Sequence, residues 1–305
     1  MVGCLQRIRP KAMADDQHSQ TSCGWYGRRF YIIKILMKTY ACITSMDQKY
    51  YNHCGKSCID TFCTYWPSDI VLHVYNENIR KANKKKQAQY IDWKVLGTEY
   101  QYFIDKNKDN DPLINTFAKK AFSIIHAMEN IECDRLIWID ADVISISSIH
   151  PMLLNLLSSD DVLSTHYGVF HDWGTEHQPD RKSFSCETGF FILNKKHEKF
   201  NEFVKNYKDY YLKNSGHTLR RFYDGEVYGA VVKKLSEEGV KMLELNDEYY
   251  YRSPIPRSVL APYIEHMKAK NKDHWNNESI MASLGLINEN ENENDNDNDN
   301  NEEIQ

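Results

Sequence analysis

The segment RLIWIDADV, residues 135–143, constrains the fold of this chain more than any other stretch. Its apolar residues form an uninterrupted run, which is typical of a strand covered on both faces in a parallel sheet. Asp140 and Asp142 follow that run directly. In open α/β sheets, ligands bind beyond the carboxyl ends of the strands. The segment therefore predicts a buried central strand whose end carries two carboxylates at a ligand-binding edge.

Strand-like and helix-like segments alternate on both sides of this motif. The expected strands are residues 40–46, 69–75, 135–139, 161–165, 188–194 and 240–246. The expected helices, with apolar residues at helical spacing, are residues 47–66, 111–130, 151–157, 196–212 and 224–235. Alternation of this kind predicts an α/β fold with a mixed, mostly parallel sheet flanked by helices.

The two ends of the chain differ from its middle. Residues 1–36 show no helical or strand periodicity, and the Asn-rich segment after Ile287 contains eight acids and no base. Low-complexity polar sequence cannot bury enough apolar surface to fold. We therefore predict a poorly ordered N-terminal extension at 1–36, a folded domain at 37–285, and a disordered tail at 286–305.

Charge and cysteine content restrict the partners and the compartment. The acidic tail accounts for the formal net charge of −5, and no basic face emerges elsewhere, so nucleic acid is not expected as a partner. His53, Cys54, Cys58 and Cys63 match no common zinc spacing. Eight cysteines without a CxxC pair favour a reduced, cytoplasmic protein. No apolar run approaches the roughly 20 residues of a transmembrane helix, and no signal-peptide pattern is visible.

The paired aspartates need a physical reason. Two carboxylates this close repel each other, and burial would raise their pKa values. A divalent cation removes both difficulties, and oxygen ligands suit Mg²⁺ or Mn²⁺. Such an ion can stabilise a departing nucleotide diphosphate. The alternative is a solvated strand end, because D-x-D triplets are common by chance. The apolar residues before and after the triplet favour the metal site.

Several further segments match, in order, those of one enzyme family. They are YACITSMDQKYY, FAKKAFSIIHAM, LIWIDADVI, CETGFFILN, FYDGEVYGAVV and YIEHMKAKNKDHW. With these motifs the chain resembles a nucleotide-sugar glycosyltransferase of the GT-A fold, most closely the glycogenin-type family eight and its viral or bacterial relatives. The resemblance implies a Rossmann-like GT-A domain. It also implies a hexosyltransferase that moves a sugar from a nucleotide diphosphate donor, UDP-linked, to a hydroxyl of a carbohydrate or another acceptor.

The resemblance also implies a metal site and catalytic residues. Asp140, Asp142 and His266 correspond to the family's ligands for Mn²⁺, or for Mg²⁺ in its place. Glu187 and Asp224 correspond to positions beside the sugar and the acceptor. If the anomeric configuration inverts, one of these two carboxylates would act as general base. If it is retained, a carboxylate or the leaving phosphate would assist on the same face.

The implied donor-binding residues come from several motifs. They are Thr44 and Ser45 beside the nucleoside, Lys120 at the sugar or phosphate, Asp140 at the metal, and Lys272 at the leaving diphosphate. The late motif departs from the family's pattern, because Ala269 replaces a glycine and His274-Trp275 replaces Pro-Trp. Lys268 or Lys270 could therefore serve in place of Lys272.

Two other departures affect the implied catalytic residues. Glu187 and Thr188 replace an Asn-Ser/Ala pair, and Glu226 replaces a glutamine. The loop at 166–184 is long, polar and rich in histidine, and long loops of this kind are often functional. We predict that it serves as a lid or an acceptor loop.

Three other functions are compatible with parts of this pattern. A haloacid-dehalogenase-type phosphatase also carries D-x-D after an apolar strand, but near its first strand, whereas residues 37–134 precede the motif here. A non-catalytic nucleotide- or carbohydrate-binding module on the same fold would bind UDP equally well without metal. A nucleotidyltransferase on a related sheet would release pyrophosphate instead of a nucleoside diphosphate.

Overall fold

The strands form two sheets. The computed structural model describes residues 38–82, 84–110, 112–172, 182–213, 219, 222–246, 254–267 and 277–286. Within these residues, seven strands form one sheet in the order β3-β2-β1-β4-β7-β6-β8, and β5 and β9 form a two-stranded sheet. The predicted extension at 1–36 and nearly all of the predicted tail lie outside the described residues. The boundaries of the folded domain therefore stay a prediction.

The main sheet is mixed and mostly parallel. Its strands are β1 (Tyr40–Asp47), β2 (Val71–Glu77), β3 (Ala88–Asp92), β4 (Arg135–Ile139), β6 (Ser164–Asp172), β7 (Lys182–Asn194) and β8 (Met242–Glu244). β1 pairs in parallel with β2 and β4, β2 pairs in parallel with β3, and β6 pairs in parallel with β8. β7 runs antiparallel to its neighbours β4 and β6. The predicted fold class, an α/β sheet of this kind flanked by helices, is confirmed.

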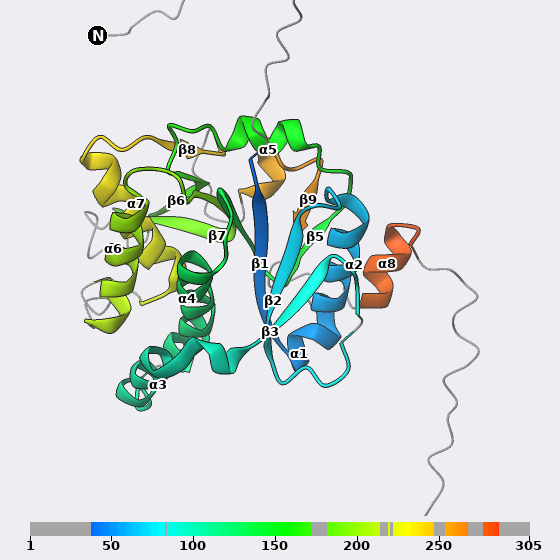
Figure 1. Ribbon diagram of the computed structural model, residues 1–305, viewed down its shortest axis with the longest axis horizontal. Helices are drawn as coiled ribbons and strands as arrows, with labels where there is room; N and C mark the ends of the chain where they lie inside the picture. The colour runs from blue at the N-terminus through cyan, green and yellow to red at the C-terminus, as the bar shows by residue number, and fades with distance from the viewer. Residues whose placement is uncertain are drawn as a thin grey trace, which may run out of the picture. The chain divides into compact units, whose positions relative to one another are not determined.

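Helices cover both faces of the main sheet (Figure 1). They are α1 (Gln48–Tyr50), a π-helical turn (Tyr51–Gly55), α2 (Lys56–Tyr65), α3 (Gly97–Lys106), α4 (Pro112–Asn130), α5 (Pro151–Leu157), α6 (Phe200–Leu212), α7 (Asp224–Glu237) and α8 (Asn277–Ser283), with 3-10 turns at Trp93–Leu96 and Ile255–Arg257. One apolar core joins the sheet to α3, α4, α6 and α7, and a second joins it to α2 and α5. Of the helices in the described ranges, none is long and apolar enough to span a membrane.

The two cores explain the apolar run of β4. Leu136 and Trp138 belong to the core under α4, whereas Ile137 and Ile139 belong to the core under α2. All four side chains are buried, because alternate residues of a strand point to opposite faces and both faces are covered here. The strand therefore ends with Asp140 on the side of α4, in line with Trp138.

The predicted helices and strands are present, and most of their ends are shifted by a few residues. The exceptions are β6 and β7, which extend well into the segment predicted as a loop, so residues 166–172 and 182–184 form paired strands and that part of the loop prediction is wrong. The elements without a sequence prediction are β3, α3, β5 (Val143–Ser145), β9 (Ile264–His266) and α8. β3 is an edge strand whose residues are half-buried or exposed, so its apolar signal is weak. β5 and β9 have three residues each, which is too short for any periodicity.

The small sheet joins two distant parts of the chain. β5 pairs antiparallel with β9, and Val143 lies opposite His266. The backbone N–H of Met267 also donates to the carbonyl oxygen of Asp142 at 2.8 Å. These contacts bring the segment after Asp140 and Asp142 directly against His266. In the sequence, His266 follows Asp142 by 124 positions.

β7 is irregular at the level of the aspartates. Thr165 of β6 pairs with Ile192, but Tyr167 pairs with Glu187, so two positions along β6 correspond to five along β7. Extra residues of this kind bend a strand and redirect its side chains. Within the irregular segment, Gly189 accepts a hydrogen bond from the backbone N–H of Asp140 at 2.9 Å. The irregularity therefore places Glu187 and Thr188 beside the end of β4.

Candidate metal centre and active site

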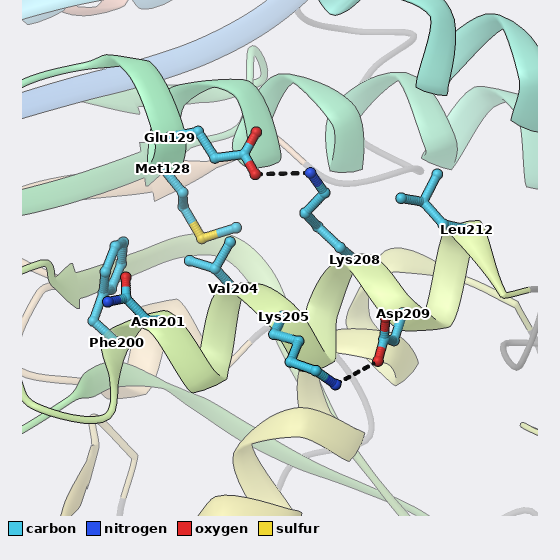
Figure 2. Close-up of a pocket in the computed structure, with 9 residues that line it drawn as sticks. All are labelled: Met128, Glu129, Phe200, Asn201, Val204, Lys205, Lys208, Asp209 and Leu212. Atoms are coloured by element: carbon cyan, nitrogen blue, oxygen red, sulfur yellow. Dashed lines mark hydrogen bonds and ion pairs between the residues drawn. The ribbon is translucent and has the colours of Figure 1, made fainter.

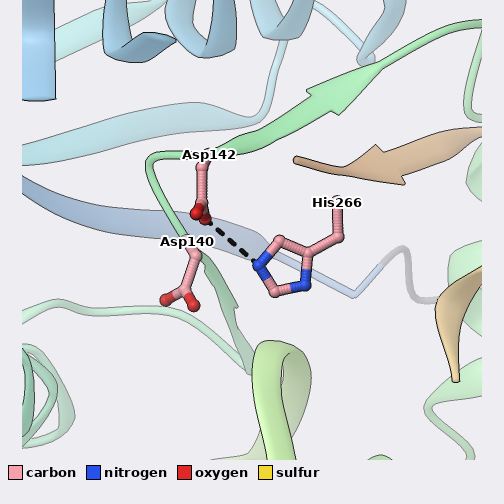
Figure 3. A group of neighbouring side chains, drawn as sticks. All are labelled: Asp140, Asp142 and His266. Atoms are coloured by element: carbon pink, nitrogen blue, oxygen red, sulfur yellow. Dashed lines mark hydrogen bonds and ion pairs between the residues drawn. The ribbon is translucent and has the colours of Figure 1, made fainter. Parts of the chain in front are cut away.

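Three possible metal ligands converge at the carboxyl end of β4 (Figure 3). Asp140 follows β4, Asp142 lies in the turn before β5, and His266 ends β9. One ligand atom from each of the three lies within 4.8 Å of the other two. Nε2 of His266 is 3.2 Å from Oδ1 of Asp142. The structure thus brings together the three residues that the resemblance implied as ligands.

Backbone hydrogen bonds hold the turn that carries the two aspartates. The N–H of Val143 donates to the carbonyl oxygen of Asp140 at 2.9 Å, which closes a tight turn. The turn is tied to β7 through Gly189 and to the residue after β9 through Met267. These hydrogen bonds hold the backbone on both sides of the turn from which the two carboxylates project.

Asp140 is held through one of its two carboxylate oxygens. Oδ1 accepts hydrogen bonds from Lys120 Nζ at 2.6 Å and from the indole Nε1–H of Trp138 at 2.7 Å. Burial raises the pKa of Asp140 above its ordinary value, and Lys120 acts in the opposite direction. Since both donors use Oδ1, Oδ2 is the oxygen that can be offered to a cation.

Lys120 joins two carboxylates from different elements. Its ammonium group lies 2.6 Å from Asp140 Oδ1, 2.8 Å from Asp224 Oδ2 and 2.7 Å from the carbonyl oxygen of Thr188. Burial alone would lower the pKa of Lys120, but the charges of Asp140 and Asp224 outweigh burial and raise it. The three hydrogens of the ammonium group therefore have protein acceptors, and the implied contact of Lys120 with a donor stays a prediction.

Asp224 is the first residue of α7 and is 7 % exposed. Burial alone would raise its pKa, but Lys120 and the hydroxyl of Thr188, which donates to Asp224 Oδ2 at 2.5 Å, lower it. An acidic residue is also favoured at a helix N-terminus. At Gly225 a side chain would collide with the carbonyl oxygen of Cys186, so this glycine lets α7 pack directly on β7. Asp224 is thus held as a carboxylate beside Lys120.

Glu187 lies on the other side of His266. Its Oε1 is 3.7 Å from His266 Nδ1 and accepts the backbone N–H of Gly189 at 3.1 Å. Burial alone would lower the pKa of His266, but the hydrogen bond to Asp142 and the charges of Asp142 and Glu187 raise it. A Cβ at Gly189 would lie 2.7 Å from His266 Cε1, so only glycine leaves room for the imidazole ring.

The donor set fits a divalent cation. Two carboxylates supply the hard oxygen ligands that Mg²⁺ and Mn²⁺ prefer, and a neutral imidazole shifts the preference toward Mn²⁺. Asp142 and His266 are 6 % and 8 % exposed, so both are shielded from bulk water. The neighbouring carboxylates raise the pKa of His266 against the effect of burial, so a cation that binds Nε2 would have to compete with a proton.

The remaining predicted residues are placed differently. Thr44 and Ser45 are neighbours on β1, so their side chains point to opposite faces of the sheet and cannot contact a nucleoside in the same way. The hydroxyl of Thr44 is buried without a hydrogen-bond partner in the described part of the chain. Lys272, Lys268 and Lys270 lie outside the described residues, as does the middle of the predicted lid loop.

Two residues of the site, Trp138 and Gly189, were not predicted from the sequence. Trp138 lies two residues before Asp140, and residues two apart on a strand share a face, so that spacing could have indicated the contact. Gly189 gave no comparable signal, because the collision it avoids involves His266, which is distant in sequence.

A separate cavity of about 520 Å³ lies between the end of α4 and α6 (Figure 2). Its lining residues are Met128, Glu129, Phe200, Asn201, Val204, Lys205, Lys208, Asp209 and Leu212. Met128 follows Lys120 by two helical turns, which places it roughly 12 Å further along the axis of α4. Lys208 pairs with Glu129 and Lys205 pairs with Asp209 within the cavity itself. This cavity is therefore separate from the candidate site.

No family model matches the chain, and no curated protein matches it. Among solved structures, it is similar to mouse xyloside xylosyltransferase 1 in its apo form, with 10 % identity and a TM-score of 0.47 over 68 % of this chain and 85 % of that one. It is similar to galactosyltransferase LgtC in complex with donor and acceptor sugar analogues, with 14 % identity and a TM-score of 0.46 over 81 % of this chain and 96 % of that one.

A third similar structure is the glycosyltransferase GlyE of Streptococcus pneumoniae TIGR4, with 13 % identity and a TM-score of 0.47. That match covers 83 % of this chain and 61 % of the other. At these identities and TM-scores, the likeness assigns neither an activity nor a substrate to this chain. Membership of family eight stays a prediction.

Proposed function

We propose that this chain is a metal-dependent glycosyltransferase, which moves a sugar from a nucleotide diphosphate donor, preferably a UDP-sugar, to a hydroxyl acceptor. The observation that carries the proposal is the convergence of Asp140, Asp142 and His266 at the carboxyl end of β4. Open α/β sheets bind their ligands at that edge. An Asp-Ala-Asp turn alone would be weak support, and the third ligand from β9 strengthens it.

The chemistry that we propose is charge stabilisation. A bound Mn²⁺ or Mg²⁺ would offset the negative charge that grows on the diphosphate as the sugar bond breaks. Asp140, Asp142 and His266 would hold the ion. Lys120 and Trp138 hold Oδ1 of Asp140, so that Oδ2 stays available. Lys272, which follows His266 closely in the chain, is our candidate for contact with the leaving diphosphate.

Asp224 is our candidate for contact with the sugar or the acceptor. Its lowered pKa keeps it ionised at neutral pH, and an ionised carboxylate accepts hydrogen bonds from sugar hydroxyls. A low pKa also makes Asp224 a weak base, which favours a role in orientation over proton removal.

The rival functions have less support. In a haloacid-dehalogenase-type phosphatase, the motif should lie near the first strand. Here it follows β4 in the centre of the sheet, and β1, β2 and β3 come earlier in the chain. A binding module would need no ion, and the burial of Asp142 and His266 3.2 Å apart supports an ion site instead. No observation specifically favours a nucleotidyltransferase.

The test is a screen of nucleotide-sugar donors with Mn²⁺ and a panel of hydroxyl acceptors, with release of nucleoside diphosphate as the readout. We expect acceptor-dependent release that EDTA abolishes and that added Mn²⁺ restores. Hydrolysis of a simple phosphomonoester without any sugar nucleotide would favour the phosphatase instead. Release of pyrophosphate would favour the nucleotidyltransferase, and UDP binding that persists unchanged in EDTA without turnover would favour a binding module.

The matched variants are Asp142→Ala and Asp161→Ala. Asp142→Ala removes a buried ligand, and we expect it to lower turnover by at least about 100-fold while the thermal melt stays cooperative, because a catalytic metal supplies several kcal/mol. Asp161 pairs with Lys241 at an exposed site, so Asp161→Ala should leave turnover unchanged. Full activity of Asp142→Ala would disprove the metal assignment.

A further inference from the structure

We propose that Glu187 is a positioning residue that orients the imidazole of His266 for metal binding. The proposal rests on the proposed function, because it concerns the same metal site. It assigns Glu187 a role beside the ion and not at the acceptor. The sequence departure at this position, a glutamate where the resembled family has asparagine, would then serve the metal site of this chain in particular.

The first observation is the direction of the ring. The two nitrogens of His266 face two different carboxylates, with Nε2 3.2 Å from Asp142 Oδ1 and Nδ1 3.7 Å from Glu187 Oε1. Figure 3 shows Nε2 pointing toward the aspartates and Nδ1 pointing away from them. Nε2 is therefore the nitrogen that can bind an ion held by Asp140 and Asp142.

The second observation concerns the proton. A neutral imidazole that binds a cation through Nε2 carries its hydrogen on Nδ1. Nδ1 of His266 is buried and has no hydrogen-bond partner within the described residues, and the side chain is 2 % exposed, so water has little access. A movement of roughly 0.5 Å by Glu187 would bring Oε1 into hydrogen-bond range of Nδ1. A metal-bound histidine commonly donates its other N–H to a carboxylate in this manner.

The third observation is that a backbone hydrogen bond directs the carboxylate of Glu187 toward the ring. Its Oε1, the oxygen that faces the ring, accepts the backbone N–H of Gly189 at 3.1 Å. Gly189 also provides the space for the ring, since a Cβ there would lie 2.8 Å from Nδ1. The irregular segment of β7 places both residues beside His266. The backbone thus sets the carboxylate and the ring against each other.

The alternative role is removal of a proton from the acceptor. That role needs a carboxylate directed at the substrate, whereas Oε1 of Glu187 is directed at the protein's own Gly189 and His266, and the side chain is 11 % exposed. The two roles make different predictions about metal affinity, because a group that acts only on the acceptor has no effect on binding of the ion alone.

The experiment measures Mn²⁺ affinity of the full chain without donor or acceptor, by electron paramagnetic resonance of free Mn²⁺. We expect Glu187→Gln to weaken Mn²⁺ binding about 10- to 100-fold, the range typical of residues that orient a metal ligand. The matched control is Glu265→Gln, which removes the same charge next to His266 but on the opposite face of β9. The control should bind Mn²⁺ within about threefold of the wild type, because a charge that does not face the site is screened.

A second pair of variants separates positioning from a general effect on the fold. If Glu187 acts through His266, Glu187→Gln should cause no further loss of Mn²⁺ affinity in a His266→Ala background. An additional loss of the same size in that background would contradict the proposal. Unchanged Mn²⁺ affinity of Glu187→Gln together with a large loss of turnover would also contradict it, and would assign Glu187 to the acceptor.

A measurement on the wild-type chain does not depend on whether the variants fold. With Zn²⁺ as a diamagnetic probe, proton NMR should show one imidazole N–H that is protected from exchange and is absent from His266→Gln. Absence of such a proton from Zn²⁺-saturated wild type would overturn the proposal for Glu187 alone. If wild type binds neither Mn²⁺ nor Zn²⁺, the metal site and the proposed function fail together with it.

Discussion

The clusters around Lys120 and around His266 lie side by side but are built in opposite ways. Lys120 contacts Asp140, Asp224 and the backbone of Thr188, all within 2.8 Å, so its charge is neutralised by the protein alone. His266 lies between two carboxylates at 3.2 and 3.7 Å, and its Nδ1 lacks a hydrogen-bond partner among the described residues. The first cluster is neutralised by protein groups alone, whereas we propose that a cation completes the second. On this proposal, one group of side chains contributes to stability and its neighbour binds the ligand.

The strongest test of this contrast is Lys120→Met. Removing the ammonium group leaves Asp140 and Asp224 buried without a cation, and we expect a loss of about 3–5 kcal/mol in the free energy of unfolding. Urea denaturation measures it. The matched control is Lys119→Met, since Lys119 pairs with Glu77 at a site where both side chains are a quarter to a third exposed. That change should cost less than about 1 kcal/mol, and equal losses in the two variants would contradict the contrast.

The second test is Trp138→Phe, which removes the indole N–H that donates to Asp140 Oδ1 at 2.7 Å. A hydrogen bond to a charged group contributes about 1.5–3 kcal/mol, so unfolding free energy should fall by that amount. Trp93→Phe is the control, because the indole N–H of Trp93 has no hydrogen-bond partner in the described ranges. If both variants lose the same stability, ring size and not the hydrogen bond explains the result.

The third test is Gly189→Ala, which adds a Cβ 2.7 Å from His266 Cε1. Overpacking of this kind costs about 1–3 kcal/mol, and the displaced ring should also bind Mn²⁺ more weakly. Gly55→Ala is the comparison, since its nearest neighbour is the flexible side chain of Met46. Calorimetric titration with Mn²⁺ distinguishes the two, and unchanged affinity in Gly189→Ala would show that the ring position is not critical.

The smallest expected effect is the pH dependence of the unfolding free energy of the metal-free chain. Burial opposes the charged form of His266, but Asp142 and Glu187 raise its pKa above the ordinary value of 6.5. The protonated ring therefore stabilises the folded chain fully below that value, and this contribution is lost as pH rises through the folded-state pKa. The slope should not exceed about 1.4 kcal/mol per pH unit for one proton. In contrast, the raised pKa of Lys120 and the lowered pKa of Asp224 keep these two groups charged over the same range.

Unfolding curves at a series of pH values, with EDTA present, measure this effect. The control is His266→Gln, which should lack the His266 component of the slope. Mn²⁺ affinity should change in the opposite direction and increase with pH, because the ion needs the neutral imidazole. A His266-dependent stability that increases with pH would contradict the assignment.

Much of the fold could be predicted from local sequence. The apolar run of β4 predicts burial on both faces, and the helical spacing in residues 111–130 predicts α4. These signals are contained in consecutive residues, so no tertiary contact is needed to detect them. β5 and β9 could not be predicted, since each is three residues long and exists only as the partner of the other.

The residues of the candidate site also differ in whether local sequence could predict them. Asp140 and Asp142 could be identified because they end an apolar strand, and Glu187, Asp224 and His266 followed only from a resemblance to known motifs. That resemblance did not predict that the ammonium group of Lys120 would form ion pairs with Asp140 and Asp224. It also did not predict that Glu187 would face the imidazole, because that contact depends on where the irregular segment of β7 places Glu187.

The sequence by itself determined that a buried strand ends in two carboxylates, because burial and repulsion between like charges are local properties of nine consecutive residues. Only the tertiary structure decided what surrounds those carboxylates. The irregularity in β7 and the pairing of β5 with β9 bring Glu187 and His266 to the same turn, across 124 residues between Asp142 and His266. Such convergence depends on the paths of several strands through the core, and no local pattern records it.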